Sequence, residues 1–527
     1  MYKKTLIILI FFFYFYFYEL SNIPGLNGDD AWFMSKSLDI KNHGLFRNIG
    51  GMGNYTGVLH PYLMYLSNII FPDIIFAGRI LNLFSVIIIS ILLIIILKSD
   101  IPNNLILLLI ILFSLNPFNF GFHRVAWPHS LLPLFSISGI LFFHGYLKTK
   151  KTLYLAAALI IAGLGAQLHP VMTLQVGFYI IFILIYQRQL AKQIISSKTF
   201  IFLAICFLIG SFSVVYFNIN AVQRLFGIHL TNIIEIGFFK VINILIIRFA
   251  QYSKIFINNF TGYPSLEYFS GILYSNIALK ILLYSYSVLL LFSAIHNCLS
   301  KNNLLKNIFG FHSIFLFFAI PFFLEFGGFN MHKLHPGEER IFLITTPIIF
   351  INYILFADNL KTYSKKIFYS FSAAIICINI INISYNYFYN FKTTGGTGDQ
   401  CYFINEKDAK LHAAEYISKN YSDSNTIIFV QDYWLYWPLK IYFQNKSYEI
   451  FYAPKCKIPR HGYPEINEFS EIYKKYPNKN ILFAVWSDLN NKELSDFLSN
   501  NKKLKSIQKK NGAETIYIYS CNNSNVI

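Results

Sequence analysis

The sequence predicts a mainly α-helical, polytopic membrane protein of about 11 transmembrane helices, with interfacial helices and a small C-terminal α/β domain. Two observations lead to this fold class. Of the 527 residues, 55% are hydrophobic and only 13% are charged, against about a quarter in soluble domains. The hydrophobic residues also form blocks near the ~20 residues that cross a bilayer. This composition excludes disordered, collagen-like and disulfide-scaffold proteins and argues against a purely soluble enzyme.

Hydrophobic blocks define the expected spans along the first three quarters of the chain. They lie at 5–20, 75–97, 104–121, 127–146, 153–168, 171–187, 199–218, 276–297, 308–326, 341–357 and 367–389. The fifth and sixth blocks are short and meet at His169-Pro170. No small-x-small cleavage motif follows the first block, so we expect an uncleaved membrane anchor rather than a signal peptide.

Basic residues gather in every second loop. The net charge is +18, from 44 Lys and Arg against 26 Asp and Glu. The basic loops are Lys3-Lys4, Lys98, Lys148 to Lys151, Arg188 to Lys198, Lys301 to Lys306 and Lys361 to Lys366. This is the positive-inside pattern, so we expect these loops and the N-terminus in the cytoplasm and the C-terminus outside. The same placement argues against nucleic acid as the partner of the basic charge.

The domain organisation follows from a change of composition near Lys392. We expect a transmembrane domain at 1–392, a Gly- and Thr-rich linker at 393–398, and a soluble extracytoplasmic α/β domain at 399–527. Within the last domain, periodicity predicts helices at 408–420 and 491–500 and strands at 426–430, 480–485 and 514–519.

Two long outer loops, 21–74 and 219–275, contain amphipathic stretches at 31–45 and 233–257 that are suited to the membrane interface. The cytoplasmic loops are short and contain neither a P-loop nor a Gly-rich dinucleotide turn, which excludes an ATP-driven pump.

The strongest local motif is the acidic pair Asp29-Asp30, just beyond the outer end of the first span. A carboxylate there can act as a general base toward an acceptor hydroxyl. The alternative interpretation is a solvated turn, or a helix start at which Asp29 is the N-cap.

Further motifs follow this pair along the chain. They are Asp29-Asp30-Ala31, Asn42-His43-Gly44-Leu45, Tyr55 to Tyr62, Gly78 to Asn82, Arg124 to Ser130, Gln167-Leu168-His169 and Glu339-Arg340-Ile341-Phe342. Their order resembles that of the bacterial GT-C membrane glycosyltransferases of glycosyltransferase family 39, which include protein O-mannosyltransferase-like and aminoarabinose-transferase-like enzymes. Two departures stand out: Asp-Asp replaces the usual Asp-Glu, and His60-Pro61-Tyr62 stands where Lys-Pro-Pro is common.

The resemblance implies a sugar donor linked to polyprenyl phosphate, an extracytoplasmic glycan, lipid or protein acceptor, and a location in the bacterial cell (inner) membrane. The expected reaction is an inverting displacement at the anomeric carbon. Asp29, with Asp30 as the alternative, takes the proton of the acceptor hydroxyl. The leaving group is a phosphate anion, so no paired general acid is needed, in contrast to glycoside hydrolysis.

The departing phosphate needs cations where its charge develops. The candidates are Arg340, Lys333, His332, His335, Arg124 and His60. For Arg340 the alternatives are snorkelling at a span end or pairing with Glu338. We expect no cofactor and no metal, because the loop histidines fit zinc spacing poorly and nothing indicates a divalent cation.

Further candidates lie at a span end and in the last domain. Gln167 and His169 are candidates for the acceptor or sugar cavity, although an uncharged polar cap on a short helical hairpin is the more frequent explanation of a histidine such as His169. The aromatic run Trp434 to Pro438 is suited either to stacking on a sugar or to packing against the membrane domain.

Two rival functions remain. One is a transporter or flippase of lipid-linked saccharides, which predicts polar residues deep in several spans and internal repeats. The other is an oligosaccharide polymerase or ligase of the same fold class.

Overall fold

The structure is a computed structural model of the chain. It describes residues 14–43, 56–194, 198–216, 246, 277–300, 303–326, 338–394, 408–452, 478–487, 498–499, 501–508 and 514–521. The predicted interfacial stretch at 233–257, apart from residue 246, and most of the first span therefore lie outside the described residues.

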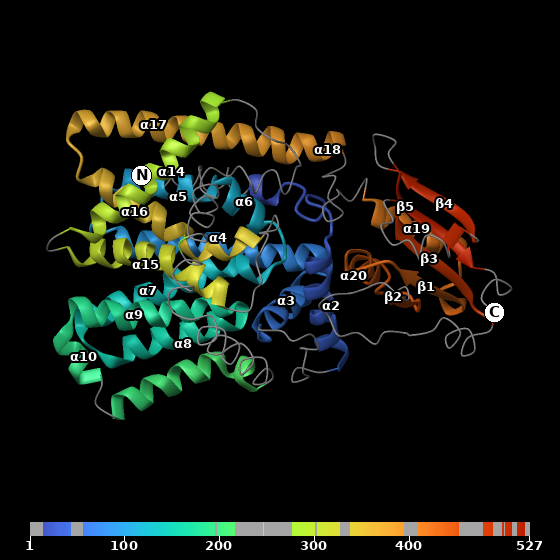
Figure 1. Cartoon of the computed structure of the whole chain (residues 1–527), viewed down its shortest axis with the longest axis horizontal. Helices are drawn as coiled ribbons and strands as arrows, with labels where there is room; N and C mark the ends of the chain where they lie inside the picture. Colours follow the sequence, from blue (N-terminus) through green and yellow to red (C-terminus); the bar gives the residue numbers. More distant parts are fainter. Residues whose placement is uncertain are drawn as a thin grey trace.

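Helices form the first and larger part of the molecule (Figure 1). In chain order they are α2 (Gly28–His43), α3 (Leu59–Ile70), α4 (Ile74–Leu97), α5 (Asn103–Ser114), α6 (Pro117–His123), η1 (Pro128–Leu131), α7 (Leu132–Thr149), α8 (Thr152–Leu168), η2 (Pro170–Met172), α9 (Thr173–Tyr186), α10 (Arg188–Ile194), the helix Lys198–Tyr216, α14 (Ile277–Cys298), α15 (Leu304–Phe326), η3 (Glu338–Thr345), α16 (Thr346–Asp358), α17 (Thr362–Ile381), the π-helix η4 (Asn382–Tyr389) and α18 (Asn390–Thr394).

The expected count of eleven spans is not confirmed. Within the described residues, six helices are long and apolar enough to cross a bilayer, and a seventh span results if α5 and α6 are counted together. These two helices meet at a bend of 62°, because Asn116 caps α6 by accepting hydrogen bonds from the amides of Phe118 and Asn119, and Pro117 follows it. The apolar helices Thr152–Leu168, Pro170–Tyr186 and Leu304–Ile320 are shorter.

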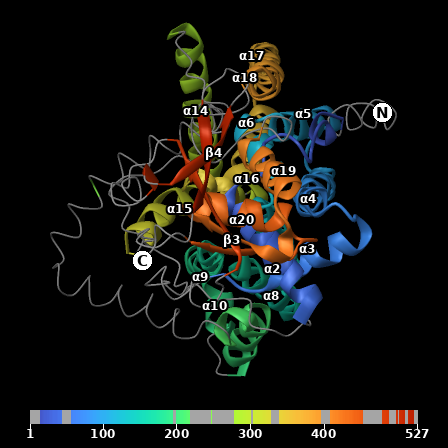
Figure 2. The same ribbon diagram turned by 90° about the vertical axis from the view of Figure 1, so that its right-hand side faces the viewer.

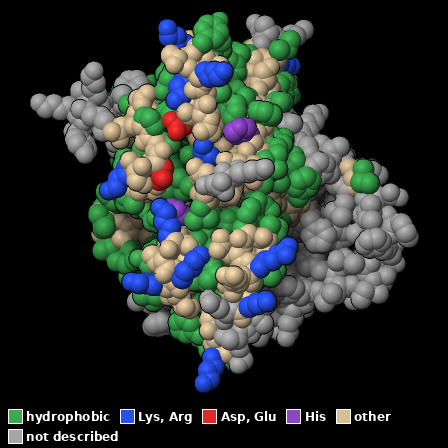
Figure 3. Space-filling view, turned by 90° about the vertical axis from the view of Figure 1, so that its left-hand side faces the viewer, with side chains coloured by type: hydrophobic (Ala, Val, Ile, Leu, Met, Phe, Trp, Pro, Cys, Tyr) green, Lys and Arg blue, Asp and Glu red, His purple; other side chains and the backbone are tan. Residues whose placement is uncertain are grey.

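Exposed basic side chains gather at the end of the helical part that lies farthest from the strands. Figure 3 shows this face. Exposed basic residues lie in or next to the α4–α5, α7–α8, α9–α10 and α16–α17 connections: Lys98, Lys148, Lys150, Lys151, Arg188, Lys192, Lys361 and Lys366. The helical part therefore has one basic end, and α2 and α3 lie at the other (Figure 1).

A five-stranded sheet with two flanking helices forms the rest, and we call it the sheet unit. The strands are β1 (Thr426–Val430), β2 (Glu449–Tyr452), β3 (Asn480–Trp486), β4 (Lys502–Gln508) and β5 (Glu514–Cys521), and the helices are α19 (Ala409–Asn420) and α20 (Tyr433–Tyr442). The strand order is β2-β1-β3-β5-β4. The first three strands are parallel, whereas β5 runs antiparallel to both β3 and β4.

Most of the secondary structure expected for the sheet unit is present. Helix α19 and strands β1, β3 and β5 coincide with predicted elements, but β2, β4 and α20 were not predicted. Of the helix expected at 491–500, only residues 498–499 are described, and they are helical. Thr393 and Thr394, expected in the linker, end α18 instead.

The sheet unit contacts the helical part through α20, which packs on α2 (Figure 2). Trp437 and Ile441 of α20 share an apolar cluster with residues of α2, α3 and α4, among them Trp32, Met64 and Ile75. The aromatic run Trp434 to Pro438 therefore packs largely against the helical part, which was one of its two interpretations.

Candidate active site

The candidate site is built on the first turn of α2. Asn27 is the N-cap of this helix: its side-chain oxygen accepts a hydrogen bond from the amide of Asp30 at 2.7 Å, and its carbonyl accepts one from Ala31 at 3.0 Å. The alternative interpretation of Asp29 as the N-cap is therefore wrong, because the helix starts at Gly28 and the preceding residue makes the cap. Both carboxylates lie in the first turn, where the helix dipole favours negative charge.

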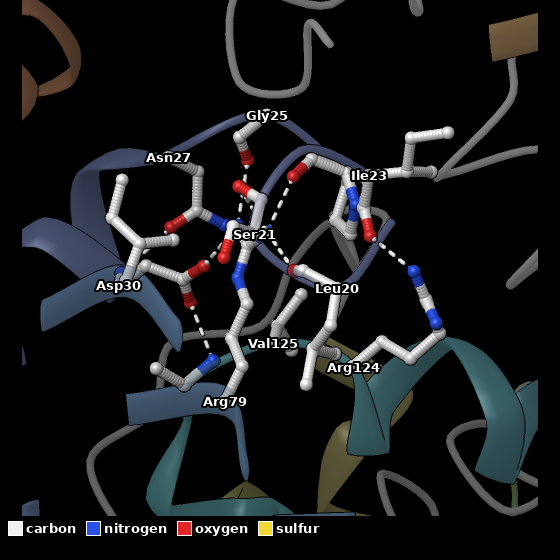
Figure 4. Close-up of polar contacts among 12 residues, drawn as sticks. Leu20, Ser21, Ile23, Gly25, Asn27, Asp30, Arg79, Arg124 and Val125 are labelled. Carbon is white, nitrogen blue, oxygen red and sulfur yellow. Dashed lines mark hydrogen bonds and ion pairs between the residues drawn. The ribbon is translucent and has the colours of Figure 1, made fainter. Parts of the chain in front are cut away.

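Asp30 is fully buried and held at both carboxylate oxygens. One oxygen accepts from Nη2 of Arg79 at 3.1 Å, and the other accepts from the amide of Ala126 at 3.0 Å (Figure 4). Burial raises the pKa of the Asp30 carboxyl to about 6, while the Arg79 guanidinium opposes this shift. A general base must reach its acceptor hydroxyl, so this position favours a structural role for Asp30.

Arg79, on the first turns of α4, holds the segment that precedes α2. Its side chain is fully buried and donates hydrogen bonds to four main-chain carbonyls as well as to Asp30. The acceptors are the carbonyls of Leu20, Ser21, Pro24 and Gly25, at 2.7 to 3.4 Å. Three residues further along the same face, Asn82 donates to the carbonyls of Val125 and Trp127. The Arg79 and Asn82 pair thus joins two segments that are distant in sequence.

Arg124, the C-cap of α6, holds the upstream part of the same segment. It is fully buried and donates to five carbonyls, those of Phe15, Tyr16, Tyr18, Glu19 and Ile23. The rings of Phe120, Tyr387 and Phe388 lie 5.0 to 5.6 Å from its guanidinium carbon. We expected Arg124 to contact the carrier phosphate. The structure instead favours a scaffold role, because its guanidinium is enclosed by carbonyls and rings.

Asp29 has different surroundings from its neighbour. Its side chain is half-buried, and one carboxylate oxygen accepts a hydrogen bond from the hydroxyl of Tyr433 at 3.2 Å. Tyr433 is the first residue of α20, so this contact joins the helical part to the sheet unit. Sequence reasoning missed Tyr433, although it precedes the aromatic run that was noticed. The Asp-x-x pattern of a helix N-cap at Asp432 was the signal that could have revealed the helix.

His60 lies on α3 but does not provide the expected cation. It is 1% exposed, and its ring packs edge-on to Phe33 with the ring centres 4.9 Å apart. Burial lowers the pKa of His60 to about 3, so the ring is neutral near pH 7. In the part of the chain that the structure describes, neither ring nitrogen has a hydrogen-bond partner.

Gln167 and His169, the predicted cavity residues, are buried at the end of α8. Gln167 accepts from the Ser213 hydroxyl and donates to the Gly210 carbonyl, both at 2.6 Å. The Nδ1 atom of His169 accepts from the amide of Val171 at 3.1 Å, so this histidine caps η2. This contact agrees with the interpretation of His169 as a polar cap.

The remaining phosphate candidates cannot be placed with the others. His332, Lys333 and His335 lie outside the described residues, and for Arg340 only the backbone, in η3, is described. Their role stays a prediction. Among the described residues, no three His, Cys, Asp or Glu side chains gather as a metal site would require.

The comparisons with known proteins identify the fold. No protein-family model and no curated protein matches the sequence. Among solved structures, the chain is similar to ArnT from Cupriavidus metallidurans in the apo state, with a TM-score of 0.63 and 9% identity over 99% of this chain and 98% of that chain. The crystal structure of the same protein bound to undecaprenyl phosphate gives a TM-score of 0.60, with the same identity and coverage. The mycobacterial arabinofuranosyltransferase AftD overlaps less, with a TM-score of 0.35.

The chain therefore has the fold of the GT-C glycosyltransferases, as the order of its motifs predicts. This fold and the long apolar helices make it a multi-pass membrane protein. The narrower assignment to glycosyltransferase family 39 stays a prediction.

Proposed function

We propose that the protein is a glycosyltransferase that moves a sugar from a polyprenyl-phosphate carrier to an acceptor hydroxyl outside the cytoplasm. The similarity to a structure with bound undecaprenyl phosphate supports the carrier class. The observation that carries the chemistry is the contrast between two adjacent carboxylates: Asp30 is enclosed by its own chain, whereas Asp29 is half-buried in the same helix turn.

In this proposal Asp29 removes the proton from the acceptor hydroxyl as its oxygen attacks the anomeric carbon. The bond between that carbon and the carrier phosphate breaks, and the phosphate leaves as an anion, with inversion at the anomeric carbon. Asp30 takes no part in proton transfer. It anchors the first turn of α2 through Arg79 and the amide of Ala126, so that Asp29 keeps a fixed position.

We also propose the orientation of the chain in the membrane. The basic residues lie at one end of the helical part and α2 lies at the other (Figures 1 and 3). If the positive-inside rule holds for this end, the first turn of α2 and the sheet unit face outward, where lipid-linked donors are used and nucleotide sugars are not.

The direct test is a transfer assay with purified protein and a radiolabelled polyprenyl-phosphate sugar. Asp29→Asn should lower the transfer rate by about 10²- to 10⁴-fold, the usual contribution of a positioned general base. Asp39→Asn is the matched control, because Asp39 lies on the same helix, beyond its first turn, and forms a partly exposed ion pair with Lys36 at 3.5 Å. It should retain wild-type activity.

The outcomes separate the candidate functions. Full activity of Asp29→Asn would remove the proposed base. Movement of the lipid-linked sugar across sealed vesicles, without transfer to any acceptor, would identify a flippase. Activity only with diphosphate-linked oligosaccharides would identify a polymerase or ligase of the same fold.

A further inference from the structure

Tyr433 reaches the candidate base from a different part of the molecule. Its hydroxyl donates a hydrogen bond to a carboxylate oxygen of Asp29 at 3.2 Å, and the two residues are 404 positions apart in sequence. The phenol comes from the sheet unit and the carboxylate from the helical part. The surroundings of Asp29 are therefore complete only when both parts are in place.

The sheet unit holds Tyr433 rigidly at the start of α20. Asp432 caps this helix by accepting a hydrogen bond from the amide of Leu435 at 3.1 Å. Its other oxygen accepts from the indole nitrogen of Trp486 at 2.9 Å, at the end of β3. The amide of Trp486 donates in turn to the side chain of Gln431 at 2.8 Å. Tyr433 is thus fixed to the carboxyl ends of the parallel strands β1 and β3.

Helices α2 and α20 also pack closely together at Tyr433. A Cβ atom added at Gly28 would lie 2.7 Å from the ring of Trp434 and 2.8 Å from the ring of Tyr433. Further along the interface, the ammonium groups of Lys36 from α2 and Lys440 from α20 lie 5.8 and 5.1 Å from the ring of Trp437. The interface thus places the Tyr433 hydroxyl beside the first turn of α2.

We propose that Tyr433 is a positioning residue for Asp29, and that the sheet unit completes the active site by supplying it. This inference rests on the proposed function, in which Asp29 is the base. A hydrogen bond to one carboxylate oxygen restricts rotation of the side chain, so the carboxylate keeps one orientation toward the acceptor hydroxyl. The role suits a phenol, which donates one hydrogen bond without bringing a charge.

The test measures kcat and the KM for the donor in full-length protein with Tyr433→Phe, which keeps the ring and removes the hydroxyl. We expect kcat to fall about ten-fold because the base loses its alignment, with little change in the KM for the donor. Incorporation of 3-fluorotyrosine at position 433, which keeps a hydroxyl donor in nearly the same shape, should retain the wild-type kcat.

Tyr442→Phe is the matched control on the same helix. Its hydroxyl donates to Asp408 at 2.9 Å within the sheet unit, so its loss should lower thermal stability without lowering kcat. An unchanged kcat in Tyr433→Phe, with Asp29→Asn inactive, would overturn the positioning role and leave the proposed function intact. Equal activity of wild type and Asp29→Asn would overturn the proposed function itself.

Discussion

The two sides of the first turn of α2 are held in different ways. On the side of Asp30, two buried arginines from α4 and the end of α6 bind nine main-chain carbonyls of residues 15–25, and one of these arginines also binds the carboxylate. On the side of Asp29, a neutral phenol from the sheet unit donates to the carboxylate. The contacts on the side of Asp30 fix the backbone, whereas the contact on the side of Asp29 orients one side chain. Substitutions on the side of Asp30 should therefore affect stability, and those on the side of Asp29 should affect activity.

The largest effect should come from Arg79→Met. This substitution leaves the buried charge of Asp30 without its partner and four carbonyls without donors, which should cost about 3–5 kcal/mol of unfolding free energy. Thermal unfolding in detergent measures it. Arg188→Met, at an exposed position of α10, is the control and should change stability by less than about 0.5 kcal/mol. An unchanged midpoint for Arg79→Met would contradict the scaffold role.

Arg124→Met should follow, with a loss of about 2–4 kcal/mol. It removes the arginine donor from five carbonyls, of which that of Glu19 still accepts from the amides of Asn22 and Ile23, and it breaks no ion pair with a carboxylate. The same unfolding assay applies, together with binding of undecaprenyl phosphate by the folded variant. A specific loss of carrier affinity without a loss of stability would restore the phosphate role that we expected for Arg124.

Asp30→Asn and Asp29→Asn form the third comparison. Asp30→Asn should destabilise the protein by about 1–3 kcal/mol, because the amide nitrogen that replaces one oxygen faces a donor. Asp29→Asn should change stability by less than about 0.5 kcal/mol while lowering the transfer rate by about 10²- to 10⁴-fold. Equal destabilisation by the two variants would show that the two sides of the turn do not differ.

The smallest effect should come from His60→Leu. The buried ring makes no hydrogen bond within the described residues, so an apolar side chain should leave stability unchanged or raise it by up to about 1 kcal/mol. Thermal unfolding and the KM for the donor are the readouts. A large rise in KM would show that His60 contacts the carrier after all.

The sequence predicted the helices and strands that contain a clear run or period of hydrophobic residues. The apolar blocks located α4 and α14, and the short apolar run at 426–430 located β1. The sequence did not predict β4, which lies at the edge of the sheet. Its Lys-rich segment is typical of an edge strand, in which lysines prevent pairing with other chains, and lacks the apolar pattern of a buried strand. The sequence also did not predict α20, because Pro438 lies inside that helix.

The site was predictable only to the level of the acidic pair. Adjacent residues of a helix point about 100° apart, so which carboxylate faces inward depends on where the helix starts, and Asn27 decides this. Arg124 illustrates a second difficulty. A guanidinium suited to phosphate is equally suited to carbonyls, and the choice depends on a loop that lies more than 100 residues away in sequence.

The reach of the two arginines has a consequence for biosynthesis. The carbonyls of residues 15–25 leave the ribosome long before their donors, since Arg79 follows Leu20 by 59 residues and Arg124 follows Tyr16 by 108. A nascent chain that has not yet exposed α6 thus lacks the donor of five of these nine carbonyls. The segment before α2 is then held in full only after α4 and α6 have been made, and Tyr433 can reach the first turn of α2 only near the end of synthesis.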